Sequence, residues 1–486
     1  MNIKRSIVKK EKNKILKAGI WYTICNFFVK GISFLTLPIF TRILTKNEIG
    51  LFSNVLSWFN ILAIITTFEI YSSVSIARFD YKENLNEYIS SSLVLGTIIT
   101  FIYYVIVLIF HNFFENLLMM DFLTLNIIFI YLLVYPAFQM YQIKSQIDYK
   151  YKNIILSSLI SVLSSTVLSI CLAIFMKNSL IGRTIGYFIP LIITSIIIYI
   201  MLLKDSNKMS TKYWKYALRV SVPLIFHLLA GYVLSASDKI MITKLISAEA
   251  NASYSVAYSV SQIASILWLS TNNVWSPWAY SKMDEKNYFT LKNKSKPYTL
   301  FFVFVVFILM IIAPEILYVM GGKKYIDARY VIPCVMTGYI IQFVYSFYVN
   351  IEFYHKKQTN IAIGTIIAAL INIVLNFIFI PKIGYIAAAY TTLIGYMSLL
   401  IIHYLFVKKL RRTNWYDTKF FAIIILVSLL FMVVCNILYK YNTLRYSIIC
   451  FIILIVLCVM YKRRKEIFKA LKNKSVIELY EALKIV

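Results

Sequence analysis

Acidic residues and catalytic signatures are both scarce in this sequence of 486 residues. Asp and Glu number 21 against 50 Lys and Arg, which gives a net charge of +29, and there are 4 histidines. We find no P-loop, dinucleotide-binding, HExxH or GxSxG pattern, so the sequence gives no support to the enzyme classes that carry them. The 6 cysteines form no CxxC pair and lack metal-ligand spacing, which predicts no metal site.

Long apolar stretches, by contrast, occupy most of the chain. Hydrophobic residues make up 60% of it, and the mean hydropathy is +0.74. About 20 apolar residues cross a bilayer as a helix, so the pattern predicts an all-α polytopic membrane protein with 14 transmembrane helices. The predicted spans are 18–43, 49–77, 85–110, 122–143, 153–176, 180–203, 216–237, 250–280, 298–320, 328–354, 358–380, 383–407, 418–439 and 444–460.

The basic residues alternate between the two sides of these spans. Segments on the side of the N-terminus, counted with the adjoining span ends, hold 37 Lys and Arg, whereas those on the opposite side hold 12. Positive charge marks the cytoplasmic side, so we expect both termini to be cytoplasmic. The excess charge is then explained by orientation and by anionic headgroups, and we expect no nucleic-acid partner.

The sequence also repeats itself. Residues 42–53 match residues 244–255 at a constant offset of 202, which pairs Ser53 with Ser255. A weaker match at an offset of 209 pairs Gly186 with Gly395. Because a repeat of six helices starts both halves on the same side, the repeat axis runs along the membrane normal. We therefore predict two pseudo-symmetric six-helix lobes plus two C-terminal helices.

The predicted organisation has five parts. They are a cytoplasmic basic N-terminus (1–17), an N-lobe (18–210), a C-lobe (211–410), two further helices (411–461) and a cytoplasmic basic amphipathic tail (462–486).

Ionisable residues at membrane depth are the candidates for function, since a charge at the centre of a membrane helix costs at least about 2.5–3.5 kcal/mol. Lys30 lies near the middle of the first span and is a candidate cavity cation for an anionic substrate. His227 lies at similar depth in the seventh span and is the repeat equivalent of Cys25. Glu69, in the second span, is a candidate for a coupling ion or for pairing with Lys30. A satisfied structural role stays open for all three.

Other ionisable residues lie near span ends, where charged anchors are ordinary. Three cations near the mouths of a cleft are candidates for handing a phosphorylated headgroup through it: Arg42, Arg78 and Lys239. The others, which the same position marks as anchors, are Asp238, Glu315, Glu352 and His403.

Four motifs resemble the polysaccharide biosynthesis or oligosaccharide flippase family of Wzx type, in the MATE-like multidrug/oligosaccharidyl-lipid/polysaccharide superfamily. They are TRILTKNEIGLFS at 41–53, SDKIMITKLIS at 237–247, GGKKYIDA at 321–328 and NFIFIPKIGYIAAAYTT at 376–392. The family's TR and D(R/K) positions are Arg42, Asp238 and Lys239, and its N…IPxxG positions are Asn376, Pro381 and Gly384. The usual second glycine of that run is Ala387 here.

The resemblance implies a flippase rather than an enzyme. Its substrate would be an undecaprenyl-pyrophosphate-linked oligosaccharide, moved to the outer leaflet of a bacterial cell membrane. Lys30, Arg42, Arg78 and Lys239 would bind pyrophosphate. The candidates for ion coupling are Glu69, His227 and Asp238. No cofactor is expected. A proton or Na⁺ gradient would supply the energy, and the partners would be membrane lipids and other polysaccharide-assembly proteins.

Two functions of the same superfamily stay open, namely a drug or cation antiporter and a flippase of lipid II, the peptidoglycan precursor. A membrane enzyme of glycan assembly is disfavoured, because the outward loops are short and carry no acid–base cluster.

Overall fold

A computed structural model describes residues 25, 28–29, 31–206 and 208–462. The candidate cation Lys30, the N-terminal segment 1–17 and the predicted amphipathic tail after Lys462 lie outside this part. Within it, the regular structure consists of helices, with no strand. The fold class expected from the apolar spans is therefore confirmed.

The first half of the chain forms a helical bundle. A helix at Gly31–Ile43 leads into it. The remaining elements are α2 (Lys46–Thr66), η1 (Ile70–Ser73), α3 (Val74–Asp80), α4 (Leu85–Ile109), α5 (His111–Leu118), α6 (Phe122–Ile147), α7 (Tyr151–Phe175) and α8 (Ser179–Asp205).

The second half forms another bundle with two helices added at its end. Its elements are α9 (Thr211–Leu245), α10 (Ala248–Asp284), α11 (Tyr288–Ile311), α12 (Ala313–Gly321), η2 (Lys323–Tyr330), α13 (Val331–Tyr354), α14 (Gln358–Ile383), α15 (Ile386–Lys409), η3 (Thr413–Trp415), α16 (Thr418–Leu438) and α17 (Asn442–Lys462).

Repeat-equivalent residues begin the second helix of each bundle. Thr45 caps α2 by accepting from the Glu48 amide, and the Glu48 carboxylate accepts from the Thr45 amide in return. Ser247, which is 202 residues later, caps α10 by accepting from the Ala250 amide at 3.1 Å. Such caps satisfy amides that the first turn of a helix leaves unpaired. The two starts are therefore fixed by the same local chemistry.

Two of the predicted spans are interrupted. The second, expected as one helix over 49–77, breaks after α2, where Phe68 and Glu69 adopt left-handed backbone angles (φ of 51° and 52°). The ninth, expected over 298–320, ends at Ile311 and restarts as α12 with Pro314 in its first turn. Pro314 lacks an amide hydrogen, which the first turn of a helix does not need, so it suits the restart at Ala313.

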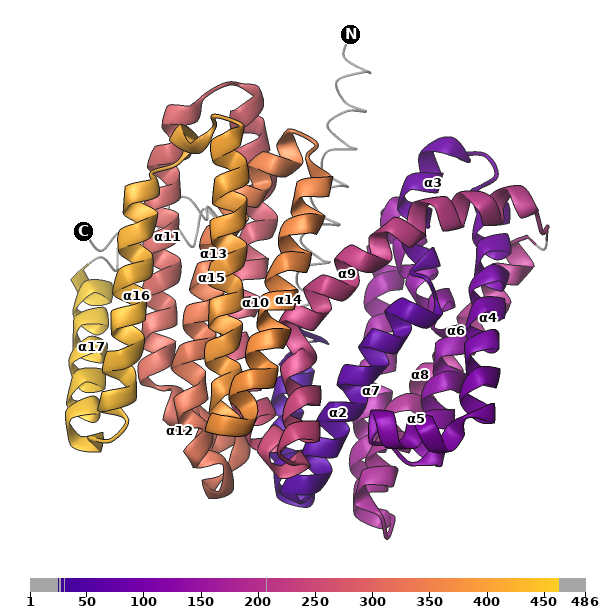
Figure 1. The fold of residues 1–486 in the computed structure, drawn as a ribbon, viewed down its shortest axis with the longest axis horizontal. Helices are drawn as coiled ribbons and strands as arrows, with labels where there is room; N and C mark the ends of the chain where they lie inside the picture. Colours follow the sequence, from indigo (N-terminus) through magenta and orange to yellow (C-terminus); the bar gives the residue numbers. More distant parts are fainter. Residues whose placement is uncertain (1–24, 26–27, 30, 207, 463–486) are drawn as a thin grey trace.

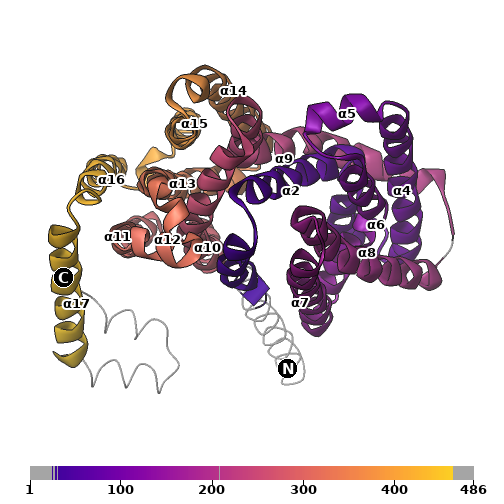
Figure 2. The ribbon, with the colours of Figure 1, turned by 90° about the horizontal axis from the view of Figure 1, so that it is seen from below.

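The two bundles lie side by side and are joined near one end (Figure 1). At that end α2 lies beside the lower part of α9 and near α12, while the bundles lean apart toward α3 and α14. Seen from below, α2, α9 and α10 occupy the middle of the molecule, and α16 and α17 lie on the far side of the second bundle (Figure 2). The long helix α9 crosses from one bundle to the other.

Eleven helices in the described part are long and apolar enough to cross a membrane. Helix α10 is not among the eleven. Its 37 residues are long enough to cross a membrane, but Ser, Thr, Asn and Gln are spread along it. It packs against α2, α9 and α13. The chain is therefore a multi-pass membrane protein with one polar helix whose first half, up to Ala264, is largely buried.

Candidate functional site

The two lobes meet through a residue and its own repeat equivalent. The hydroxyls of Ser53 on α2 and Ser255 on α10 are 2.7 Å apart. These serines correspond at the offset of 202. In a twofold arrangement, a residue that contacts its own copy lies on the symmetry axis. The pseudo-twofold axis that relates the lobes therefore passes between Ser53 and Ser255.

Backbone packs against backbone beside this axis. The side-chain amide of Asn251 donates to the Gly50 carbonyl at 2.9 Å. A Cβ atom added to Gly50 would lie only 1.7 Å from the Ala248 carbonyl oxygen, so this position of α2 requires glycine. The repeat equivalent of Gly50 is Ala252. The close approach of the lobes thus depends on a glycine in the N-lobe alone.

Two of the four family motifs meet at the same end of the molecule. The Thr41 hydroxyl donates to the Met320 carbonyl at 2.7 Å, directly before GGKKYIDA. Lys324, inside that motif, donates to the Leu44 carbonyl at 3.0 Å. Side chains of each lobe thus satisfy backbone carbonyls of the other. We call this set of contacts, together with the Ser53–Ser255 pair, the lobe junction.

The other two motifs meet in the interior of the C-lobe, around Asp238. This carboxylate accepts from the hydroxyls of Tyr254 at 2.5 Å and Thr392 at 2.6 Å, and from the Asn376 amide at 2.8 Å. The Thr391 hydroxyl donates to Asn376 in turn. The Asp238 side chain is buried, and both of its oxygens are hydrogen-bonded. It is a buried anion with its donors in place, which is the condition for keeping such a charge in a core.

A half-buried cation in the N-lobe lacks any comparable set of partners. The Arg183 guanidinium on α8 lies over the rings of Phe40 and Phe52, 4.1 and 3.8 Å from the ring centres. Its Nη1 atom is buried without a hydrogen-bond partner among the described residues. Aromatic faces attract cations but leave N–H donors unused. Arg183 is therefore a cation held in place with donor capacity to spare.

These two charges occupy related places in the repeat. Arg183 corresponds to Thr392 at the offset of 209, and Phe52 corresponds to Tyr254 at the offset of 202. The N-lobe thus stacks a guanidinium on a ring where the C-lobe directs two hydroxyls at a carboxylate. The position of that carboxylate, Asp238, corresponds to Thr36 in the N-lobe. The sequence analysis did not single out Arg183. A signal was available, because Gly186, three residues after Arg183, aligns with Gly395, three residues after Thr392.

The described cations predicted to bind pyrophosphate lie apart from one another. Arg42 is exposed and donates to the carbonyls of Pro38 at 2.7 Å and Val319 at 3.4 Å, at the lobe junction. Arg78 lies on α3, at the opposite end from α12 (Figure 1). Lys239 is half-buried on α9, with its ammonium 5.1 Å from the centre of the Tyr258 ring. They are spread along the length of the molecule.

The other two candidates for ion coupling are Glu69 and His227. Glu69 lies against α9, and His227 lies on it. Glu69 is buried at the break after α2, and its carboxylate accepts from Tyr71 at 2.6 Å and Ser72 at 3.0 Å. The Glu69 carbonyl accepts from Ser221 of α9 at 3.2 Å. His227 on α9 is half-buried, and its Nδ1 atom has no hydrogen-bond partner among the described residues.

Glu352 and His403, expected as anchors near span ends, are instead paired in the C-lobe interior. His403 Nδ1 on α15 is hydrogen-bonded to Glu352 Oε2 on α13, and both side chains are 0% exposed. Their separation of 51 residues hides the pair from motif reasoning. The anchor interpretation is wrong for these two, because neither side chain reaches the surface.

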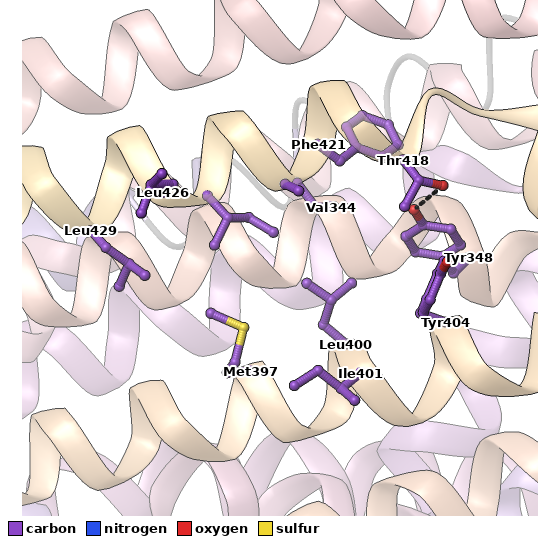
Figure 3. A pocket seen from close by; sticks show the side chains of 12 residues that line it. Val344, Tyr348, Met397, Leu400, Ile401, Tyr404, Thr418, Phe421, Leu426 and Leu429 are labelled. Carbon is purple, nitrogen blue, oxygen red and sulfur yellow. Dashed lines mark hydrogen bonds between the residues drawn. The ribbon is translucent and has the colours of Figure 1, made fainter.

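Two hollows lie on the C-lobe. One, about 380 Å³, is lined by Tyr280, Phe353 and Tyr354. The other is an apolar groove of about 330 Å³ between α13, α15 and α16, in which Met397 and Leu400 face Leu426 and Val344 (Figure 3). Its polar groups include the hydroxyls of Tyr348, Tyr404 and Thr418 at one end, with Tyr348 and Thr418 hydrogen-bonded to each other.

An ion pair at the start of α16 ties this added helix to the C-lobe. Lys296 Nζ on α11 lies 2.7 Å from Asp417 Oδ2, and Asp417 also caps α16 by accepting from the Phe420 amide. The hydrogen bond from Lys296, followed by that from Phe420, lowers the pKa of Asp417 below its usual value. In the described part of the chain, no three or more His, Cys, Asp or Glu side chains are grouped to hold a metal ion.

The comparison with protein families agrees with the two motifs at 41–53 and 237–247. The family model described as "Polysaccharide biosynthesis protein" matches residues 15–283, more than half of the chain. An uncharacterized membrane protein of Methanocaldococcus jannaschii is 24% identical over 454 residues, covering 85% of this chain and 88% of that protein.

Solved structures share the fold at low sequence identity. The lipid II flippase MurJ in an inward closed conformation gives a TM-score of 0.62 at 17% identity, covering 88% of this chain and all of that one. An inward-facing multidrug resistance MATE family transporter of the MOP superfamily gives 0.61 at 14% identity, covering 82% and 98% of the two chains. At these identities the likeness concerns the fold.

Proposed function

We propose that this chain, which belongs to the polysaccharide biosynthesis protein family, is a flippase that moves undecaprenyl-pyrophosphate-linked oligosaccharide units from the cytoplasmic to the outer leaflet. The observation that carries the proposal is the lobe junction, where Ser53 and Ser255 meet on the pseudo-twofold axis. Two repeats joined at one end of such an axis suit alternating access, in which one repeat rocks against the other around a fixed site.

The chemistry of the substrate fits cations distributed along the path between the lobes. A diphosphate and a sugar chain cannot cross hydrocarbon unaided, whereas a polyprenyl tail can stay in lipid while the head is carried by the protein. Lys30, Arg42, Arg78 and Lys239 remain the proposed pyrophosphate contacts. We add Arg183, because a half-buried guanidinium with an unused donor suits a phosphate oxygen that reaches it once the lobes separate.

The cellular setting follows from the same proposal. The protein would lie in the bacterial cell membrane with both termini cytoplasmic, driven by a proton or Na⁺ gradient and without a cofactor. Its partners would be the lipid-linked oligosaccharide, membrane lipids and other polysaccharide-assembly proteins.

Translocation in proteoliposomes tests the proposal. A labelled polyprenyl-pyrophosphate oligosaccharide is exposed to a membrane-impermeant sugar-modifying enzyme, with the parent protein, Lys30→Ala and the exposed-loop control Lys177→Ala. We expect modification that depends on the protein, is lost in Lys30→Ala and is retained in Lys177→Ala. Two further substrates, lipid II and an organic cation, run in parallel. Transport of either one without the oligosaccharide would replace the proposal by the corresponding alternative, a lipid II flippase or a cation antiporter.

A further inference from the structure

The Glu352–His403 pair lies inside the C-lobe and takes no part in the lobe junction. Both side chains are fully buried, and a hydrogen bond joins His403 Nδ1 to Glu352 Oε2. The Tyr345 ring lies edge-on to the imidazole, with the ring centres 4.9 Å apart. A carboxylate and an imidazole enclosed in this way are costly to keep in a membrane protein unless they have a function.

Each partner has an atom to spare. Glu352 Oε1 and His403 Nε2 are buried and have no hydrogen-bond partner among the described residues. The Asp238 carboxylate in the same lobe differs, because donors from three side chains satisfy both of its oxygens. A purely structural ion pair is expected to be satisfied in the same way. Because of these unsatisfied atoms, the Glu352–His403 pair can make further hydrogen bonds, as a site that exchanges a proton must.

The hydrogen bond between these groups defines the number of protons they hold. As an ion pair, the imidazolium carries the shared proton, and as a neutral pair the carboxyl carries it. In both forms the net charge is zero. Removing that proton leaves a carboxylate whose negative charge is buried with a single donor, which the interior disfavours. The pair therefore holds one proton between its two groups while it is enclosed.

The surroundings of the pair supply no permanent cation to replace that proton. Among the described residues, no Lys or Arg from α9, α10, α11, α14 or α16 forms an ion pair with Glu352. The ionisable Tyr345 of α13 lies against the imidazole, and His227 lies on α9, which packs against α14 and α15. From α14 the pair meets the bare backbone of Gly364.

We propose that Glu352 and His403 form a one-proton binding site of the C-lobe, and that this site couples a proton gradient to movement of the lobes. The second part rests on the proposed transport function. One proton enters from the aqueous phase on one side, is held on the pair while α13 and α15 enclose it, and leaves on the other side. No bond other than O–H or N–H is made or broken.

Proton binding and transport are measured separately on the full-length protein. In lipid nanodiscs without substrate, infrared difference spectra over a pH titration report protonated carboxyl groups and neutral or charged imidazole. The variants are Glu352→Gln, His403→Gln and Gly364→Ala. A Cβ added to Gly364 would lie 2.6 Å from His403 Nε2, so this substitution displaces the ring without changing a titratable group. Gly96→Ala, where the added Cβ meets only ordinary contacts of 3.7 Å or more, is the matched control.

We expect the parent and Gly96→Ala to bind a proton that Glu352→Gln and His403→Gln lack, and Gly364→Ala to titrate at a different pH. In proteoliposomes, Glu352→Gln should lose the acceleration of transport by a pH gradient. Identical titrations for the parent, Gly364→Ala and Glu352→Gln overturn the site. A normal titration with transport indifferent to pH overturns the coupling, and a normal titration without oligosaccharide transport overturns only the proposed substrate.

Discussion

The two lobes carry opposite charges at related places in their repeat. In the C-lobe, Asp238 is an anion whose donors are supplied by its own lobe, including Tyr254 and Thr392. In the N-lobe, the equivalents of those two donors are Phe52 and Arg183, which stack on each other and leave an N–H unused. The hydrogen bonds of the Asp238 carboxylate are complete, whereas those of the Arg183 guanidinium are not.

The two lobes therefore share residues that shape their helices but not their charged groups. Gly186 recurs as Gly395, and the capping residue Thr45 recurs as Ser247. The charges of Asp238 and Arg183 do not recur, because their repeat equivalents are Thr36 and Thr392. A satisfied buried charge stabilises one arrangement, whereas an unsatisfied one has binding capacity left. We therefore propose that Asp238 serves the integrity of the C-lobe and that Arg183 contacts substrate.

Replacing Arg183 with alanine breaks the comparison on the N-lobe side and should have the largest effect. A hydrogen bond to a charged group contributes about 1.5–3 kcal/mol, so we expect transport to fall about 10-fold to 100-fold. Initial rates in proteoliposomes measure this against Lys177→Ala. Arg183→Lys keeps the charge but loses the planar stacking, and should fall between the two. Unchanged transport in Arg183→Ala would return this residue to a structural role.

Gly50→Ala tests the asymmetry at the lobe junction. The added methyl group clashes with the Ala248 carbonyl, and overpacking of this kind costs about 1–3 kcal/mol. A Ser53→Cys, Ser255→Cys variant, in a background without native cysteines, reports the junction by cross-linking. We expect less cross-linking after Gly50→Ala and little change after Ala252→Gly. Equal cross-linking in both would show that the close approach is not required.

Asp238→Asn tests the completed site of the C-lobe. The new NH₂ group faces side chains that donate, so one hydrogen bond is lost and a donor is left unpaired, at a cost of about 1–3 kcal/mol. Thermal unfolding in detergent measures the loss. Thr36→Val, at the equivalent N-lobe position, should stay within about 0.5 kcal/mol because no buried charge depends on Thr36. Equal losses at the two positions would falsify the assignment.

An exposed ion pair supplies the baseline for these buried charges. Asp417→Asn should cost only about 0.2–1 kcal/mol at pH 7, because Lys296 and Asp417 are both partly exposed. The pKa of Asp417 is lowered in the folded protein, so its contribution is present above the unfolded value and is lost as the pH falls below about 4. Parent and variant melts should differ at pH 7 and converge in acid. A difference that persists in acid points to the helix cap rather than to the ion pair.

Apolar runs and the repeat were enough to predict the fold, because membrane crossing places a strong requirement on composition over about 20 residues. Interruptions within the runs were less visible. The break at Phe68 and Glu69 uses left-handed backbone at residues that are not glycine, so no local signal marks it. Pro314 does carry a signal, which a criterion of length and hydropathy alone ignores.

The site was predictable only in part, because its groups are assembled across distant helices. Asp238 and Asn376 were singled out by their motifs, but their hydrogen bond requires α9 and α14 to be packed together. Arg183 looked like a residue at a span end until the rings from two other helices were placed around it. Depth estimated from the sequence gave Glu352 and His403 an interfacial position, and the third dimension buries them.

The position of the Ser53–Ser255 contact also determines how far the distant ends of the helices would move in the proposed rocking motion. Apart from the first part of α9, which packs on the N-lobe, the lobes are joined at one end, so in the proposed rocking motion that contact would act as a fulcrum and the helices as lever arms. A helix of 25 residues, such as α4, is about 38 Å long. A rotation of about 10° around the serines would then displace the far ends by roughly 7 Å, while the hydroxyls themselves hardly move. The contact between Ser53 and Ser255 would thus control a much larger movement at the other end of the lobes.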